Sequence, residues 1–126
     1  MRIRNLLTVS VLATGLLASG AAPAAASATT DGSCTLTVTP FYQSIGMHTA
    51  TATLSGGCTG VIDIVMEQAP SPDGPFQEVD TLFYLLRSED GKSAIGYFTD
   101  PEKRGLCRAK ATANGLTAYS PNLTYC

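Results

Sequence analysis

The sequence predicts an all-β fold: a seven-stranded sandwich closed by two disulfide bonds. Three observations support this class. Short runs rich in Thr, Val, Ile and Tyr alternate between apolar and polar residues, which is the period of a strand with one buried face. Stretches rich in Gly, Pro, Asp and Asn separate these runs and are typical of turns. Four cysteines in so short a chain indicate two disulfides.

Each expected strand is an alternating run between two turn stretches, and no segment after the first 28 residues has a sustained helical period. The seven ranges are 34–41, 48–55, 60–68, 76–87 (a strand and the crossover after it), 93–99, 106–112 and 117–125. The turn stretches between them include SGGCTG, PSPDGP, SEDGKS, DPEKRG and ANG. Residues 29–33 are expected to be a frayed start.

The first two strands show the alternation most clearly. Leu36 and Val38 share one parity in the first strand, and threonines occupy the other. In the second strand the apolar set is Ala50, Ala52 and Leu54. One face of each strand is therefore expected in the core and the other in water.

The N-terminus is predicted to be a signal peptide covering residues 1–28. Two arginines precede an apolar run at 6–17, and small residues favour cleavage between Ala28 and Thr29. A membrane anchor is the alternative, but a span needs about 20 apolar residues and this run is interrupted earlier by glycine and proline. We therefore expect a secreted protein with a bacterial type of leader and one domain at 29–126.

The charge of this mature part limits the kinds of partner. It contains six basic and ten acidic residues, a net charge of −4. This balance gives no electrostatic basis for binding nucleic acid or anionic lipid. We expect neither nucleic-acid binding nor stable membrane insertion after the leader is removed.

Three stretches resemble parts of an immunoglobulin-like domain of the fibronectin type III kind. EQAPSPDGPFQEVDT resembles the turn between its third and fourth strands, YFTDPEKRG the corner before the sixth, and CRAKATANGLTAYSPNLTY the last hairpin. The resemblance covers most of 34–126 and implies an immunoglobulin-like sandwich. The chain departs from the family in lacking tryptophan and in carrying Cys107 where a tyrosine is usual.

Strand direction predicts how the four cysteines pair. If consecutive strands alternate in direction, Cys34 and Cys58 lie at one end of the sandwich and Cys107 and Cys126 at the other. Cross-pairing would have to span a strand of about 23 Å, whereas bonded cysteines have Cα atoms within about 7 Å. We expect the disulfides Cys34–Cys58 and Cys107–Cys126. The cysteine spacing does not fit a zinc site.

The registers of the two hairpins follow from this pairing. If Cys34 faces Cys58, then Leu36 faces Gly56, and the apolar residues stay on one face. In the last hairpin, a three-residue loop would place Cys107 opposite Leu123.

That second register turns Tyr119 and Tyr125 inward and gives Cys126 the wrong parity. A bulge or kink at Pro121 would restore it.

No residue is expected to be catalytic, and no cofactor or metal is expected. His48 is the only histidine, so a Ser-His-Asp or Cys-His site would need it. The cysteines are expected to be oxidised, however, and no serine stands in a nucleophile-elbow context. Asp63 and Glu67 share a strand face but would lie about 13 Å apart, beyond the ~5–9.5 Å of glycosidase carboxylates.

Two further motifs are interpreted as structural. The acidic residues of PSPDGP and SEDGK do not match a calcium loop and are explained as Asp-Gly turns. The sequon at Asn122 is expected to be empty.

The loop from Ala69 to Pro75 is the candidate interaction loop, because prolines stiffen it and stiff loops lose less entropy on binding. Its candidate residues are Pro70, Pro72, Asp73, Gly74 and Pro75. We expect it to share one end of the sandwich with residues 43–47 and 100–105, with Met47 and Phe76 as apolar anchors.

The sequence therefore favours a secreted, non-enzymatic binding module with an unknown protein or cell-surface ligand. The alternative is a small inhibitor of an extracellular hydrolase. Secreted bacterial amylase inhibitors are also two-disulfide β-sandwiches, but they are recognised by a Trp-Arg-Tyr triplet, and this chain has no tryptophan. A small enzyme using His48 is the third and least favoured hypothesis.

Overall fold

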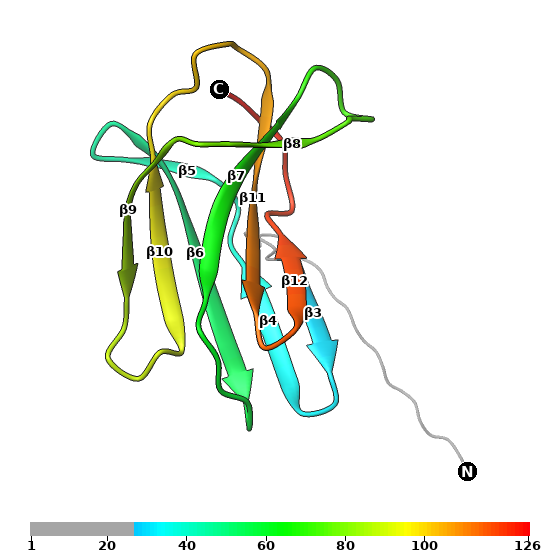
Figure 1. Ribbon diagram of the computed structural model, residues 1–126, viewed down its shortest axis with the longest axis vertical. Coiled ribbons are helices and arrows are strands. Elements are labelled where there is room, and N and C mark those ends of the chain that lie inside the picture. The colour runs from blue at the N-terminus through cyan, green and yellow to red at the C-terminus, as the bar shows by residue number, and fades with distance from the viewer. Residues whose placement is uncertain (1–26) are drawn as a thin grey trace, which may run out of the picture.

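A computed structural model of the chain describes residues 27–126 (Figure 1). Within these residues the fold is all-β: eleven strands form two antiparallel sheets, and there is no helix. The expected signal peptide lies outside the described residues, except for Ser27 and Ala28, which belong to the first strand. No helix that could span a membrane occurs in the described part of the chain.

The first sheet has the order β3-β4-β6-β10-β9, with β5 also paired to β6. Its strands are β3 (Ser27–Asp31), β4 (Cys34–Val38), β5 (Tyr42–Ser44), β6 (Met47–Gly56), β9 (Leu82–Arg87) and β10 (Ser93–Phe98). The second sheet has the order β12-β11-β7-β8, with β13 paired to β11. Its strands are β7 (Asp63–Ala69), β8 (Gln77–Val79), β11 (Leu106–Ala113), β12 (Leu116–Tyr119) and β13 (Thr124–Tyr125).

The two sheets enclose one hydrophobic core, which the alternation in the strands creates. β4 and β11 bury every second residue, as a strand with one solvated face does. Leu36, Leu54 and Phe98 of the first sheet are buried with Ile64 and Met66 of the second. In Figure 1, β7 and β11 lie in front of the first sheet.

The strand count is a correction, since eleven strands form where seven are expected. Two of the additional strands are hairpin partners. β3 forms where residues 29–33 are expected to fray, because Gly32, with φ 61°, closes a two-residue turn into β4. β5 forms because Ile45 and Gly46, with φ 49° and 77°, close a type I′ turn into β6.

The other two additional strands arise by division of expected ones. The range 76–87 divides into β8 and β9, which lie in different sheets. The range 117–125 divides into β12 and β13 around residues 120–123.

The first register is shifted by two residues from the expected one. Leu36 lies opposite Leu54, and Cys34 lies opposite Gly56. This pairing places two leucines together and keeps the expected parity. Gly56, with φ 95°, turns the chain back beyond the strand, so that Cys58 still reaches Cys34.

The last hairpin has a two-residue turn rather than three. Asn114–Gly115 has φ 54° and 79°, a type I′ turn, which Asn-Gly favours strongly. Tyr119 pairs with Lys110 on the outer face, and Tyr125 is exposed. The expectation that both tyrosines point inward is therefore wrong.

The interruption expected at Pro121 is present, because residues 120–123 belong to no strand. Cys107 then pairs with Thr124 rather than with Leu123. The shift brings the buried Cys126 beside Cys107.

Both expected disulfides are confirmed. The Cα–Cα distance is 5.2 Å for Cys34–Cys58 and 6.0 Å for Cys107–Cys126. They lie at opposite ends of the sandwich, and the C-terminus marked in Figure 1 is Cys126 of the second disulfide.

Candidate functional site

The outer face of the first sheet carries a row of tyrosines that the strand registers align. Tyr84 of β9 lies opposite Tyr97 of β10, Tyr97 opposite Thr49 of β6, and Thr49 opposite Tyr42 of β5. Directly opposed residues point to the same side of a sheet. Three tyrosines therefore share one face across four adjacent strands.

A second row of apolar side chains lies beside the tyrosines. Leu86 of β9 is opposite Ile95 of β10, which is opposite Thr51 of β6. The hydroxyl of Tyr42 lies 3.4 Å from that of Thr51, so this tyrosine leans across the face. We call Tyr42, Tyr84, Leu86, Ile95 and Tyr97 the tyrosine face.

Three of the five side chains of the tyrosine face are exposed to solvent, and Ile95 and Tyr97 between them are half-buried. Tyr84 is 55% exposed, and Tyr42 and Leu86 are each 45% exposed. Thr49 is only 1% exposed although it points to the same side, which is explained by the tyrosines on both sides of it. The tyrosines thus form the surface and the threonine lies beneath them.

Hydroxyl groups continue this face along the strands. A third row consists of Ser93, Thr53 and Thr37, and a fourth of Ser55, Thr35 and Thr30. None of the residues in these four rows carries a charge. The face changes from aromatic and aliphatic at one end to hydroxyl-rich at the other.

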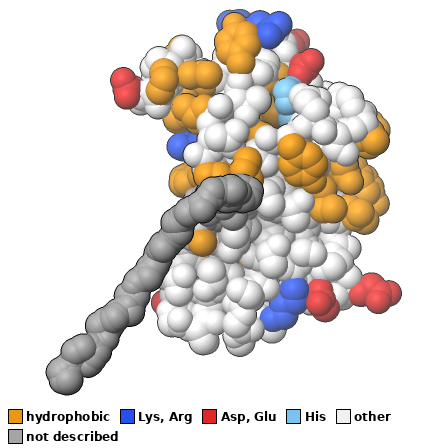
Figure 2. All heavy atoms as spheres, turned by 180° about the vertical axis from the view of Figure 1, so that it is seen from behind, with side chains coloured by type: hydrophobic (Ala, Val, Ile, Leu, Met, Phe, Trp, Pro, Cys, Tyr) orange, Lys and Arg blue, Asp and Glu red, His pale blue; other side chains and the backbone are white. Residues whose placement is uncertain are grey.

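Figure 2 looks onto this side of the molecule. Hydrophobic side chains gather on the side where β9 lies, and the visible Lys, Arg, Asp and Glu side chains lie at the periphery. β9 is also the edge strand of its sheet, and its Leu82 and Phe83 are 42% and 66% exposed. Only Leu85 of this strand packs against the core.

The outer face of the second sheet is different, because it carries charged side chains, and Glu67 is paired with two of the basic ones. Arg108 lies opposite Glu67, and its guanidinium is 2.9 Å from the Glu67 carboxylate. Lys110 lies 3.8 Å from the other oxygen of the same carboxylate. The guanidinium also lies 3.8 Å from the ring centroid of Phe76 and 4.0 Å from that of Tyr119. Phe76 is therefore covered by Arg108 and is not a free anchor, contrary to our expectation.

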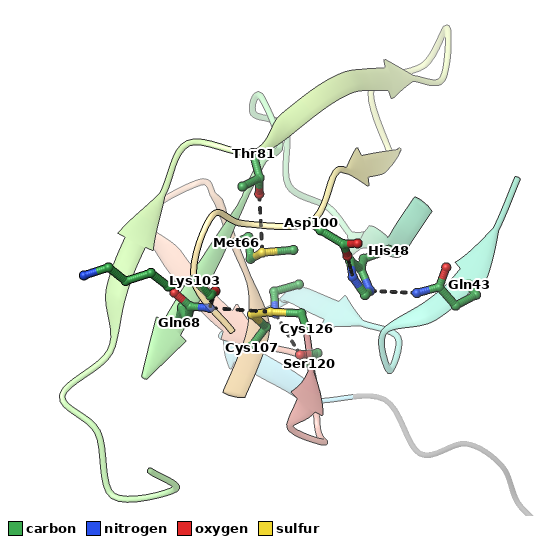
Figure 3. Close-up of a disulfide and its surroundings, with 11 residues drawn as sticks. Gln43, His48, Met66, Gln68, Thr81, Asp100, Lys103, Cys107, Ser120 and Cys126 are labelled. Carbon is green, nitrogen blue, oxygen red and sulfur yellow. Dashed lines mark hydrogen bonds and ion pairs between the residues drawn. A yellow bond between two sulfur atoms is a disulfide. The ribbon is translucent and has the colours of Figure 1, made fainter. Parts of the chain in front are cut away.

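The only histidine, His48, is buried in β6 and contacts both β5 and the loop after β10 (Figure 3). The amide nitrogen of Gln43 donates to Nδ1 at 2.9 Å, so the ring proton lies on Nε2 and is donated to Asp100 Oδ1 at 2.6 Å. His48 lines a hollow of about 350 Å³ with Asp100, and the sulfur in that lining belongs to the disulfide-bonded Cys126. These hydrogen bonds connect the β5–β6 hairpin to the β10–β11 loop.

The candidate interaction loop is exposed at the same end of the molecule (Figure 1). Its residues Pro70 and Pro75 line a hollow of about 360 Å³ with Lys103 and Arg104. The loop thus borders the 100–105 segment, as expected, and residues 43–47 connect to that segment through His48.

The two acidic residues of β7 are both held by arginines. Asp63 accepts a hydrogen bond from Arg87 at 2.7 Å, and Glu67 accepts one from Arg108 at 2.9 Å. No group of three or more His, Cys, Asp or Glu residues that could hold a metal ion occurs within residues 27–126.

Neither a family model nor a curated protein nor a solved structure matches the chain. The tyrosine face is not visible in the sequence, because its members come from three strands and meet only through their registers. The run LFYLL at 82–86 was the one available signal, since it is apolar on both parities.

Proposed function

We propose that the protein is a secreted, non-enzymatic binding module with an immunoglobulin-like fold, and that it binds its partner through the tyrosine face. The strand orders support the fold assignment. β4-β6-β10-β9 corresponds to the order A-B-E-D of an immunoglobulin sheet, and β12-β11-β7 to G-F-C. The two disulfides fit an oxidising environment outside the cytoplasm.

The exposed tyrosine face is the observation that carries the binding proposal. Soluble monomers rarely leave a contiguous apolar patch in water unless it serves as a contact surface. Tyr84 and Leu86 extend this patch to the edge of the sheet, where Leu82 and Phe83 are also exposed. Tyrosines suit a contact surface because each ring offers a large apolar area and a polar hydroxyl.

The test is retention of a partner by the immobilised mature protein, incubated with cell walls and with culture filtrate of the source organism. We expect Tyr84→Ser combined with Leu86→Ser to abolish retention. The matched control is Tyr125→Ser with Leu123→Ser, which removes the same side-chain types, also exposed, away from the face. Equal retention by both double variants would exclude the tyrosine face as the binding surface.

A second candidate function is inhibition of an extracellular hydrolase through the Ala69–Pro75 loop. The exposure of Pro70, Pro72, Asp73 and Pro75 favours it. This function predicts stoichiometric inhibition of a secreted protease or glycosidase, weakened by changing Pro72 and Asp73. Inhibition that survives those changes would exclude the loop.

A further inference from the structure

We propose that the ligand of the tyrosine face is an extended, uncharged polysaccharide with β-1,4 linkages. This inference rests on the proposed function and specifies its ligand. The class of ligand follows from the charge of the face, its shape and the spacing of its strands.

The charge of the face selects a neutral ligand. None of the residues in its four rows is Asp, Glu, Lys or Arg. A charged ligand would lose hydration on such a surface without gaining an ion pair. The net charge of −4 for residues 29–126 further disfavours acidic polymers.

The shape of the face selects a polymer rather than a small molecule. Small-molecule sites are concave, and the hollows of about 450, 360 and 350 Å³ are lined by residues outside the tyrosine face. Tyr42, Tyr97 and Tyr84 instead lie in a row across four strands of one sheet. A row of rings on an open sheet can contact successive units of a chain laid across the strands.

The spacing of the strands that carry the tyrosines matches a β-1,4-linked glycan. Tyr42 and Tyr97 lie on strands separated only by β6, so their backbones are about two strand spacings, or roughly 9.6 Å, apart. That distance is close to the length of one disaccharide in an extended β-1,4-linked chain. Tyr84 continues the row on the next strand.

The chemistry of the rows also matches the two kinds of surface on a sugar. A pyranose ring presents C–H groups on its faces and hydroxyls at its rim. The tyrosine rings and Leu86 can cover the C–H groups, and the phenolic hydroxyls can bond to the rim. Thr51, Thr53 and Ser93 add hydroxyls beside the rings, and each can donate and accept.

The structure disfavours the competing occupant, a second copy of the chain paired along the β9 edge. The register between β9 and β10 shifts between Tyr97 and Phe98, which leaves Phe83 as an extra residue in β9. A bulge in an edge strand interrupts the ladder that a second strand would need.

The test is depletion of the mature protein from solution by washed cellulose and by chitin, both uncharged. We expect binding to at least one of them, unchanged when salt is raised to about 0.5 M, because no ion pairs are involved. Tyr84→Ala should weaken binding about tenfold, roughly one lost aromatic contact. Tyr84→Phe, which keeps the ring, should bind within about threefold of the unchanged protein. Tyr125→Ala is the control and should bind normally.

A soluble cello- or chito-oligosaccharide gives a second measurement that needs no variant. NMR resonances of Tyr42, Tyr84 and Tyr97 should shift on its addition, and those of Tyr119 should not.

Three results would overturn the inference. The first is no depletion by either polysaccharide, and the second is equal depletion by uncharged polystyrene, which would indicate a general apolar contact. The third is a dimer in sedimentation equilibrium that Leu86→Ser dissociates. If cell walls or filtrate still retain a partner through the tyrosine face, only the ligand class fails and the proposed function stands.

Discussion

Replacing Gly56 by alanine should destabilise the protein far more than the same change in the last hairpin. Gly56 has φ 95°, and a Cβ there would lie 1.6 Å from the carbonyl oxygen of Ser33. Gly115 has φ 79°, and its Cβ would meet nothing within 4 Å. Both substitutions therefore place an alanine in a left-handed backbone conformation, and only the one at Gly56 also creates a clash.

The magnitude follows from these two terms. The left-handed conformation costs an alanine about 1–2 kcal/mol at either position. At Gly56 the backbone must also move to relieve the clash, which costs about 1–3 kcal/mol more, as overpacking does. The free energy of unfolding should fall by about 2–5 kcal/mol in Gly56→Ala and by about 1–2 kcal/mol in Gly115→Ala.

Urea denaturation followed by far-UV circular dichroism measures both losses in the oxidised protein. In thermal melts, each kcal/mol corresponds to about 4–8 °C in a domain of this size, so the two variants should differ by at least about 4 °C. Equal losses would show that the chain does not turn back at Gly56 as described, and the two-residue register shift would have to be reconsidered.

Three other predictions concern the second sheet and the turns. Arg108→Met should lower the free energy of unfolding by about 1–3 kcal/mol in urea, because it leaves the buried Glu67 carboxylate without its main donor. Replacing both cysteines of Cys107–Cys126 by serine should cost about 3 kcal/mol, since the bond closes a loop of 19 residues. The hydroxyl of Ser88 donates to Asp90 and, with the backbone of Lys92, lowers the pKa of that carboxyl. Ser88→Ala should raise this pKa in an NMR titration.

The predictions for Arg108 and for Ser88 each have a control or a result that would contradict them. Asp63→Asn removes the charged partner of Arg87 at an exposed site and should cost at most about 1 kcal/mol. A larger loss there than at Arg108 would contradict the role of burial. For Asp90 the lowered pKa means that any stabilisation is present above the unfolded pKa and is lost as the pH falls. An unchanged titration in the Ser88 variant would contradict the assigned hydrogen bond.

The sequence predicts which residues of a strand face the core, but it predicts less well which residues of neighbouring strands pair. The alternation in β4 and β6 predicts which residues are buried, and it is confirmed for Leu36, Val38 and Leu54. A shift of two residues preserves parity, so alternation could not distinguish the expected register from the observed one. In the observed register Gly56 lies opposite Cys34, beyond the pair of leucines.

The shortest strands are not visible in the sequence pattern. β5 has only three residues and follows Pro40, so it presents too few alternations for a pattern to be seen. The last hairpin is a different case, because Asn114–Gly115 is itself a strong signal for a two-residue turn. The Asn-Gly pair alone predicts the observed two-residue turn, whereas the alternation pattern around the cysteines favoured three residues.

The tyrosine face illustrates the limit of reading one strand at a time. Tyr42, Tyr84 and Tyr97 are far apart in the sequence, and nothing in their local patterns relates them. Their alignment depends on β9 being the neighbour of β10 and on β5 being the neighbour of β6. Residues 82–87 also lacked the alternation of a half-buried strand, since this edge strand leaves most of its side chains in water.

The two broad faces of the sandwich differ in charge: the outer face of the first sheet is uncharged along its four rows, and the outer face of the second sheet carries charged side chains. The charged side of the second sheet faces the water when the opposite side rests on a flat neutral support. Adsorbed this way, every copy would share one orientation, and both tips of the sandwich would stay free at the rim. A monolayer would then present the second sheet, with its charged side chains, to the medium.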